Sequence, residues 1–212
     1  MNRILIVITA ILFAGCTMQW GGKEDTFSYQ NFPVASGSAQ AGDGHSVTLK
    51  GTPLELQGTG VAVGDKLHDA NVAKNDLNPV NIAEPKGKVR IISVVPSLDT
   101  KVCEQQTHYL SEKNNGLDKN VELVTVSIDT PFAQTRFAKE AKINNITFLS
   151  DYRGADFGKA NGLLIKGPHL LARTVMVVDK DNVVRYMQVT PELAQMPDME
   201  AAFNAARNLT GN

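Results

Sequence analysis

Two runs of apolar, largely β-branched residues place the strongest constraint on how this 212-residue chain can fold. They are "KVRIISVV" over 88–95 and "VELVTVSID" over 121–129. Runs of this kind are typical of central strands that are covered on both faces of a sheet. The segment between them has the length of a crossover helix and ends at Asn115-Gly116, a helix-stop signal. The pattern therefore predicts a β-α-β unit at the centre of an α/β fold.

Further elements extend this unit on both sides. The patterns predict a β-hairpin over 46–58, a helix over 130–143, a strand over 146–150, a short helix over 155–162, a hairpin over 173–189 that turns at Asp181-Asn182, and an amphipathic helix over 197–209 with Met199, Phe203, Ala206 and Leu209 on its buried side. The resulting order is β-α-β-α-β-α-β-β-α. We expect one domain with a central mixed sheet that is flanked by helices and preceded by the hairpin.

The first sixteen residues, "MNRILIVITAILFAGC", have the features of a secretory signal peptide. Arg3 precedes an apolar run that is shorter than the roughly 20 residues a membrane-spanning helix needs. The residues "FAGC" resemble the lipobox of bacterial lipoproteins, although Phe13 stands where Leu, Val or Ile is usual. The resemblance implies that Cys16 is lipidated and becomes the mature N-terminus. A short buried helix is the alternative.

Residues 17–45 are rich in Gly and Ser and show no helical or alternating periodicity. We expect a flexible tether with a reach of about 30 Å, followed by a globular domain over 46–212. Aromatic residues in the tether could rest on the bilayer or on the domain. Thr17, rather than Asp, follows the cysteine, which resembles the signal for sorting to an outer membrane. The expected location is therefore the periplasmic side of a bacterial membrane, with the outer membrane favoured where one is present.

The charge balance does not favour a polyanionic partner. The chain has 21 basic and 22 acidic residues, and 42% of its residues are apolar. We therefore expect no nucleic-acid partner. The four histidines have no metal-ligand spacing, and "DKDN" over 179–182 is better interpreted as a hairpin turn than as a calcium loop. Neither a metal nor another cofactor is expected.

The segment "VVPSLDTKVCEQQ" carries the one cysteine of the exported domain, Cys103. It joins a buried strand to a helix, which is where α/β folds place reactive loops. Free N–H groups and the helix dipole at such a position favour a thiolate. Thr100 can direct its hydroxyl toward the same sulfur, and Pro96 can wall one side. The alternative is that Thr100 only caps the helix while Cys103 packs inward as a small apolar residue.

The spacing Pro-x-x-x-Thr-x-x-Cys resembles the active-site motif of peroxiredoxins, and "PSLDTKVCEQQ" is similar to its bacterial thiol peroxidase version. The segments "VTLKGTPLELQG", "VSIDTPFAQTRF" and "ARTVMVVDKDNVV" resemble further parts of that subgroup. The resemblance implies a thioredoxin-like fold and a homodimer. It also implies that Cys103 is the peroxidatic thiolate, that Thr100 hydrogen-bonds the peroxide, that Pro96 shields the sulfur and that Arg173 supplies a cation.

One position departs from the family pattern. The family usually carries a resolving cysteine directly after an "SRF"-type triplet, whereas this chain has "TRF" followed by Ala138. The resemblance then implies a one-cysteine cycle, in which an external small thiol or an exported thioredoxin-like protein reduces the Cys103 sulfenic acid. An unlipidated Cys16 acting as a resolver is one alternative. A Cys-x-x-Cys disulfide reductase is less favoured, because Thr100 occupies the partner position.

Two functions remain open at this point. The first is a peroxidase that reduces hydrogen peroxide and organic hydroperoxides at Cys103. The second is a non-catalytic redox-sensing or binding lipoprotein that keeps a peroxiredoxin fold. Ala138 motivates the second function, and the intact set of Pro96, Thr100, Cys103 and Arg173 favours the first.

Overall fold

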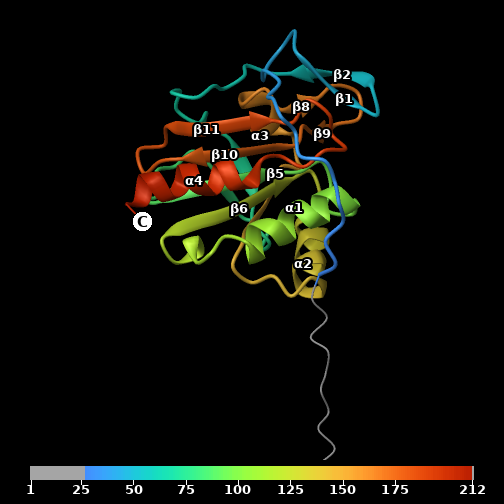
Figure 1. Cartoon of the computed structure of the whole chain (residues 1–212). Helices are drawn as coiled ribbons and strands as arrows, with labels where there is room; N and C mark the ends of the chain where they lie inside the picture. The colour runs from blue at the N-terminus through green and yellow to red at the C-terminus, as the bar shows by residue number, and fades with distance from the viewer. Residues whose placement is uncertain (1–26, 212) are drawn as a thin grey trace, which may run out of the picture.

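A seven-stranded sheet forms the centre of the structure, which is a computed structural model that describes residues 27–211 (Figure 1). From one edge to the other its strands are β11 (Val184–Val189), β10 (Thr174–Val178), β5 (Val89–Val94), β6 (Val121–Ser127), β7 (Thr147–Ser150), β3 (Asn71–Ala73) and β4 (Pro79–Asn81). The helices are α1 (Lys101–Glu112), α2 (Pro131–Glu140), α3 (Asp156–Ala160) and α4 (Met199–Thr210), with a single 3-10 turn at Leu117–Lys119.

The predicted β-α-β unit lies in the middle of this sheet. Strands β5, β6 and β7 are parallel, and α1 and α2 are the connections between them. Strand β10 is antiparallel to both β5 and β11, so the sheet is mixed. The predicted hairpin turn contains Asn182, whose φ of 67° lies in the left-handed region that Asn tolerates better than most residues. The expected mixed sheet with flanking helices is thus confirmed.

Helices cover both faces of the sheet, which explains why the central strands do not alternate apolar with polar residues. Successive residues of β5 point to opposite faces. Ile91 packs in one cluster with Phe203 of α4, and Ile92 packs in the other with Phe157 of α3. All four of these side chains are fully buried, and each contributes about 1.5–3 kcal/mol relative to exposure. Leu209, expected on the buried side of α4, is instead 38% exposed because it lies in the last turn.

The N-terminal hairpin is confirmed as β1 (Ser46–Leu49) and β2 (Thr52–Gln57), which are antiparallel. Its two-residue turn, Lys50-Gly51, has φ angles of 50° and 79°, as tight hairpin turns require. The hairpin continues into a second sheet through β8 (Leu164–Ile165) and β9 (Leu170–Leu171). Strands of two or three residues, including β3 and β4, are too short to produce a periodic sequence signal, so the sequence did not predict them.

The prediction of a flexible tether is wrong for residues 27–45. Figure 1 shows this segment, in blue, running past α1 toward the β1-β2 hairpin. The ring of Phe27 stacks on His108 of α1 at 3.9 Å. The backbone N–H of Gln30 donates to Gln105 Oε1 at 2.6 Å, and Gln105 Nε2 donates back to the Gln30 carbonyl at 3.0 Å. Three aromatic residues of the predicted tether, Phe27, Tyr29 and Phe32, therefore rest on the domain.

Backbone hydrogen bonds hold the rest of this segment. The N–H of Ala35 donates to the Met196 carbonyl, and the N–H of Ala39 donates to the carbonyl of Val189 on the edge strand β11. Local composition cannot reveal such partners because they lie about 150 residues away in the sequence. The predicted signal peptide, Cys16 and residues 17–26 lie outside the described residues. Within 27–211, no helix combines the length and apolar character that a membrane crossing requires.

A buried carboxyl group, Asp151, caps α3 directly after β7. Its two oxygens accept backbone hydrogen bonds from Phe157 at 3.0 Å and Gly158 at 2.8 Å. Burial raises the pKa of Asp151 to about 6, and the two N–H donors oppose that rise. The unfolded chain has a carboxyl pKa of about 3.9, so the folded protein binds more protons between about pH 4 and pH 6.

We expect the stability contributed by Asp151 to be fully present below about pH 4 and to be lost as the pH rises through 6. Relative to Asp151→Asn, which does not titrate, the free energy of unfolding of the wild type should fall by about 1–3 kcal/mol across this window. Denaturant unfolding of both proteins between pH 4 and pH 7 measures the difference. Parallel stability curves would show that the folded protein does not hold the proton.

Candidate active site

The first turn of α1 carries the candidate nucleophile. Thr100 is the N-cap residue, with extended backbone angles of φ −116° and ψ 142°, and Cys103 is the third residue of the helix. The predicted position of the thiol at a helix mouth is thus confirmed. Cys103 has no exposed surface and packs with Val95 and Leu98 of the preceding loop. The free N–H groups of this turn point their partial positive charge toward the sulfur side of the helix end.

Two polar groups contact the sulfur. Thr100 Oγ1 lies 2.9 Å from Cys103 Sγ, and Arg173 Nη2 lies 3.3 Å from it. Arg173 comes immediately before β10, whose first residue pairs with Val94 at the end of β5. Because β10 pairs antiparallel with β5, the guanidinium of Arg173 lies beside the loop that follows β5. The structure brings these three sequence-predicted residues together.

The Thr100 hydroxyl does not cap α1. It makes no hydrogen bond to the first N–H groups of the helix, and lies 3.2 Å from the Ser97 carbonyl in addition to its sulfur contact. The alternative in which Thr100 serves only as a cap is therefore wrong. Pro96 is buried in the same loop, where its ring presents no N–H that would need an acceptor.

Gln106 is a site residue that the sequence reasoning missed. Its Oε1 accepts a hydrogen bond from Arg173 Nη1 at 2.8 Å, and its Nε2 donates to Ser93 Oγ at 2.8 Å. Arg173 Nε donates to the Leu193 carbonyl at 2.9 Å, so two acceptors fix the guanidinium while Nη2 faces Cys103. Gln106 follows Cys103 by three positions, which places both on one helix face. This three-residue spacing is the sequence signal that could have identified Gln106 as a site residue.

We expect Gln106→Leu to slow the reaction of Cys103 with peroxide by about tenfold. The substitution keeps the volume but removes the acceptor that orients Arg173, and a lost hydrogen bond to a charged group is worth about 1.5–3 kcal/mol. Stopped-flow measurement of the peroxide reaction provides the rate. A rate unchanged from the wild type would mean that the Leu193 carbonyl alone positions the guanidinium.

The remaining sequence predictions concern absent or distant groups. Ala138 lies half-buried in α2, so this helix offers no thiol. In the described part of the chain, no group of three or more His, Cys, Asp or Glu side chains is placed to hold a metal ion.

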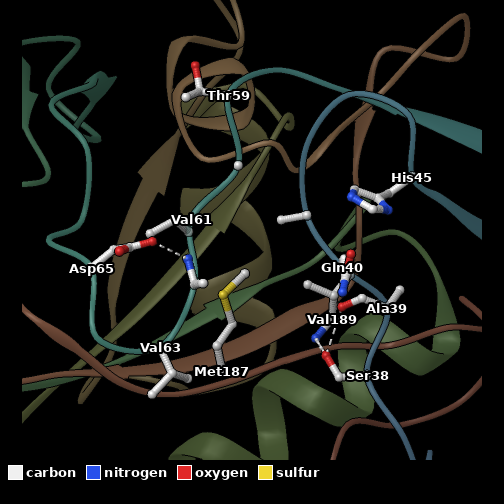
Figure 2. Close-up of a pocket in the computed structure, with 13 residues that line it drawn as sticks. Ser38, Ala39, Gln40, His45, Thr59, Val61, Val63, Asp65, Met187 and Val189 are labelled. Atoms are coloured by element: carbon white, nitrogen blue, oxygen red, sulfur yellow. Dashed lines mark hydrogen bonds between the residues drawn. The ribbon is translucent and has the colours of Figure 1, made fainter.

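A groove of about 420 Å³ between the N-terminal segment, the loop over 59–65 and β11 is shown in Figure 2. Neither Cys103 nor Arg173 lines this groove.

The fold and the site together define the class of this protein. A mixed sheet flanked by helices, with a thiol in the first helical turn after a central strand and a buried arginine beside it, is a thioredoxin-like fold of the peroxiredoxin type. The chain belongs to the Redoxin family, whose sequence model matches residues 62–203.

Individual relatives agree with this assignment. The chain is 46% identical to a thiol peroxidase of Halalkalibacterium halodurans over 162 residues, which cover 76% of this chain and 97% of the relative. It is 42% identical to a thiol peroxidase of Streptococcus pneumoniae over 163 residues, which cover 77% of this chain and 99% of the relative. The crystal structure of a peroxiredoxin-like protein from Aquifex aeolicus superposes with a TM-score of 0.74 at 36% identity, covering 82% of this chain and 99% of that one.

Proposed function

We propose that this chain is a thiol-dependent peroxidase that reduces hydrogen peroxide and organic hydroperoxides through Cys103. One observation carries the proposal. The only cysteine of the described domain lies in the first turn of α1, with Thr100 Oγ1 at 2.9 Å and a buried guanidinium at 3.3 Å from its sulfur. Similarity to curated thiol peroxidases over three quarters of the chain supports the same activity.

In the first half of the reaction, the Cys103 thiolate attacks one oxygen of the peroxide. An S–O bond forms, the O–O bond breaks, and the departing oxygen takes a proton to leave as water or an alcohol. Sulfur is oxidised to a sulfenic acid while the peroxide is reduced. Thr100 Oγ1 and Arg173 Nη2, which contact the sulfur, stabilise the charge that moves onto the departing oxygen, together with the N–H of Cys103 in the first turn of α1.

The second half requires thiols from other molecules. A first external thiol attacks the Cys103 sulfenic acid, forming a mixed disulfide and releasing water. A second thiol then attacks this disulfide, so that Cys103 returns to a thiol and the reductant leaves as its own disulfide. Ala138 supports this one-cysteine cycle because α2 contains no resolving thiol. The reductant is a small thiol or an exported thioredoxin-like protein.

We further propose that the mature protein is a lipoprotein, anchored through Cys16 on the periplasmic side of a bacterial membrane, with the outer membrane favoured by Thr17. The lipobox-like "FAGC" supports this location. A homodimer through the face near Cys103 is proposed from the family resemblance alone. Lipid analysis of the mature N-terminus tests the anchor, and an unmodified Cys16 thiol would refute it.

A non-catalytic redox-sensing or binding protein is the second candidate function. The zero exposure of the Cys103 side chain and the alanine at 138 favour it, because a sensor needs neither rapid access nor turnover. The polar contacts of the sulfur favour the enzyme, because an inert buried cysteine has no need of a guanidinium 3.3 Å away.

Steady-state peroxide consumption distinguishes the two. The purified protein is assayed with hydrogen peroxide or cumene hydroperoxide, and with glutathione, dithiothreitol or thioredoxin as the reductant. We expect repeated turnover with at least one external thiol and no change in rate when Cys16 is blocked. Accumulation of Cys103 sulfinic acid without turnover would exclude a working one-cysteine peroxidase.

A further inference from the structure

The carboxylate of Asp129 holds the loop that precedes Cys103. Asp129 lies beyond the end of β6, and its side chain reaches across to the loop that follows β5. Its Oδ1 accepts a hydrogen bond from Ser97 Oγ at 2.8 Å, and its Oδ2 accepts one from the backbone N–H of Leu98 at 2.8 Å. Its own carbonyl accepts a hydrogen bond from Ser150 Oγ at the end of β7. The backbone of Asp129 is thus held by the end of a third strand of the same sheet.

The peptide group between Ser97 and Leu98 transmits this contact toward the sulfur. The N–H of this peptide belongs to Leu98 and its C=O belongs to Ser97. The described chain has no cis peptide bonds, so the two groups point in opposite directions. On the N–H side the peptide meets Asp129, and on the C=O side it accepts the backbone N–H of Thr100 at 3.2 Å. The carboxylate therefore fixes the direction of the Ser97 carbonyl.

The direction of that carbonyl decides where the Thr100 hydroxyl can point. Thr100 Oγ1 lies 3.2 Å from the Ser97 oxygen and 2.9 Å from Cys103 Sγ, but a hydroxyl has one proton to donate. When sulfur is a thiol, the proton goes to the Ser97 carbonyl and the oxygen can accept from S–H. When sulfur is a thiolate, the proton turns to the sulfur. A rotated Ser97–Leu98 peptide would remove the acceptor of the Thr100 backbone N–H, a contact that does not depend on the state of the sulfur, and would release Thr100 from its position.

We propose that Asp129 is a positioning residue for the peroxidase reaction, acting on Cys103 through the Ser97–Leu98 peptide and the Thr100 hydroxyl. The inference rests on the proposed function and adds to it a residue outside the Pro-x-x-x-Thr-x-x-Cys segment. Asp129 touches neither the sulfur nor the peroxide. Its effect should therefore disappear when the Thr100 hydroxyl is absent.

A double-mutant cycle tests this dependence. Asp129→Ala, Thr100→Val and the double variant are compared with the wild type in the full-length protein. Two rates are measured: the reaction of Cys103 with hydrogen peroxide and its alkylation by iodoacetamide across pH. We expect Asp129→Ala to slow the peroxide reaction by about tenfold when Thr100 is present. In the Thr100→Val background the same substitution should slow it by less than about twofold. The pH dependence of Cys103 alkylation should be shifted by Asp129→Ala only when Thr100 is present.

Conservative and matched controls accompany the cycle. Asp129→Asn should retain the rate within about threefold, because an amide can accept from Leu98 N–H and donate to Ser97 Oγ. Asp151→Ala removes a carboxylate that also accepts two hydrogen bonds at a neighbouring strand end, and it should lower the thermal midpoint without changing either rate. If Asp129→Ala does not fold, Ser97→Ala replaces it in the cycle, with an expected loss of about threefold that again requires Thr100.

An equal loss with and without the Thr100 hydroxyl would overturn the proposal, as would an Asp129→Asn variant as slow as Asp129→Ala. These outcomes differ from failure of the proposed function. If the wild type reacts with peroxide no faster than free cysteine, the peroxidase proposal fails, and the alkylation cycle still decides whether Asp129 acts through Thr100.

Discussion

Replacing Cys103 with serine is expected to abolish peroxide reduction, with a loss of at least about 1000-fold in rate. Serine keeps the shape of the side chain and its place in the cluster with Val95 and Leu98. Its hydroxyl stays protonated at neutral pH and cannot carry the sulfenic acid. Steady-state consumption of hydrogen peroxide with an excess of dithiothreitol measures the effect.

Cys16→Ser is the matched control for this variant because it removes the chain's other cysteine. On the one-cysteine cycle, the purified Cys16→Ser protein should react with peroxide at the wild-type rate and turn over with the same external thiols. Thermal unfolding should show that Cys103→Ser is folded, with a free energy of unfolding within about 1 kcal/mol of the wild type. Loss of turnover in Cys16→Ser would instead identify Cys16 as the resolving thiol.

Removing the guanidinium of Arg173 is expected to have the second largest effect. Arg173→Gln should slow the reaction of Cys103 with peroxide by about 100-fold, because it removes the buried cation that lies 3.3 Å from the sulfur. Arg173→Lys should slow this reaction less, because lysine keeps the charge. It should still be slower than the wild type, because an ammonium group cannot donate to Gln106, Leu193 and the sulfur at once. Stopped-flow kinetics of the first half-reaction separate these variants from effects on the reductant.

Arg185 offers a matched control for the loss of an arginine. It lies on β11, is about half exposed and pairs with Asp179 at 2.6 Å. Arg185→Gln should leave the peroxide reaction unchanged and cost less than about 1 kcal/mol of stability. If Arg173→Gln retained the wild-type rate, its guanidinium would be structural, and the charge on the departing oxygen would be stabilised by α1 and Thr100 alone.

The central strands and the thiol motif were predictable because their signals are local. Strands β5 and β6 are buried on both faces, and this burial leaves continuous apolar runs in the sequence. The Pro-x-x-x-Thr-x-x-Cys spacing lies within eight residues, so Thr100 and Cys103 share one loop and one helical turn. Arg173 was found only through the family resemblance, since nothing near it in sequence indicates that β10 pairs with β5.

The missed features depend on contacts between distant elements. Residues 27–45 have the composition of a tether, yet Gln105 on α1 and Val189 on β11 hold them to the domain. Gln106 and Asp129 are single polar residues. Their roles exist only because β10 begins, and β6 ends, beside the loop that leads to Cys103. The pattern of residues along the sequence does not show which strand ends lie close together in the fold.

The most direct test of the one-cysteine peroxidase is a single-turnover reaction of the reduced, full-length protein with one equivalent of hydrogen peroxide, followed by dimedone trapping and peptide mass analysis. We predict reaction much faster than that of free cysteine, a trapped sulfenic acid on Cys103, and no disulfide between Cys16 and Cys103. A Cys16–Cys103 disulfide, or a reaction no faster than that of free cysteine, would contradict it.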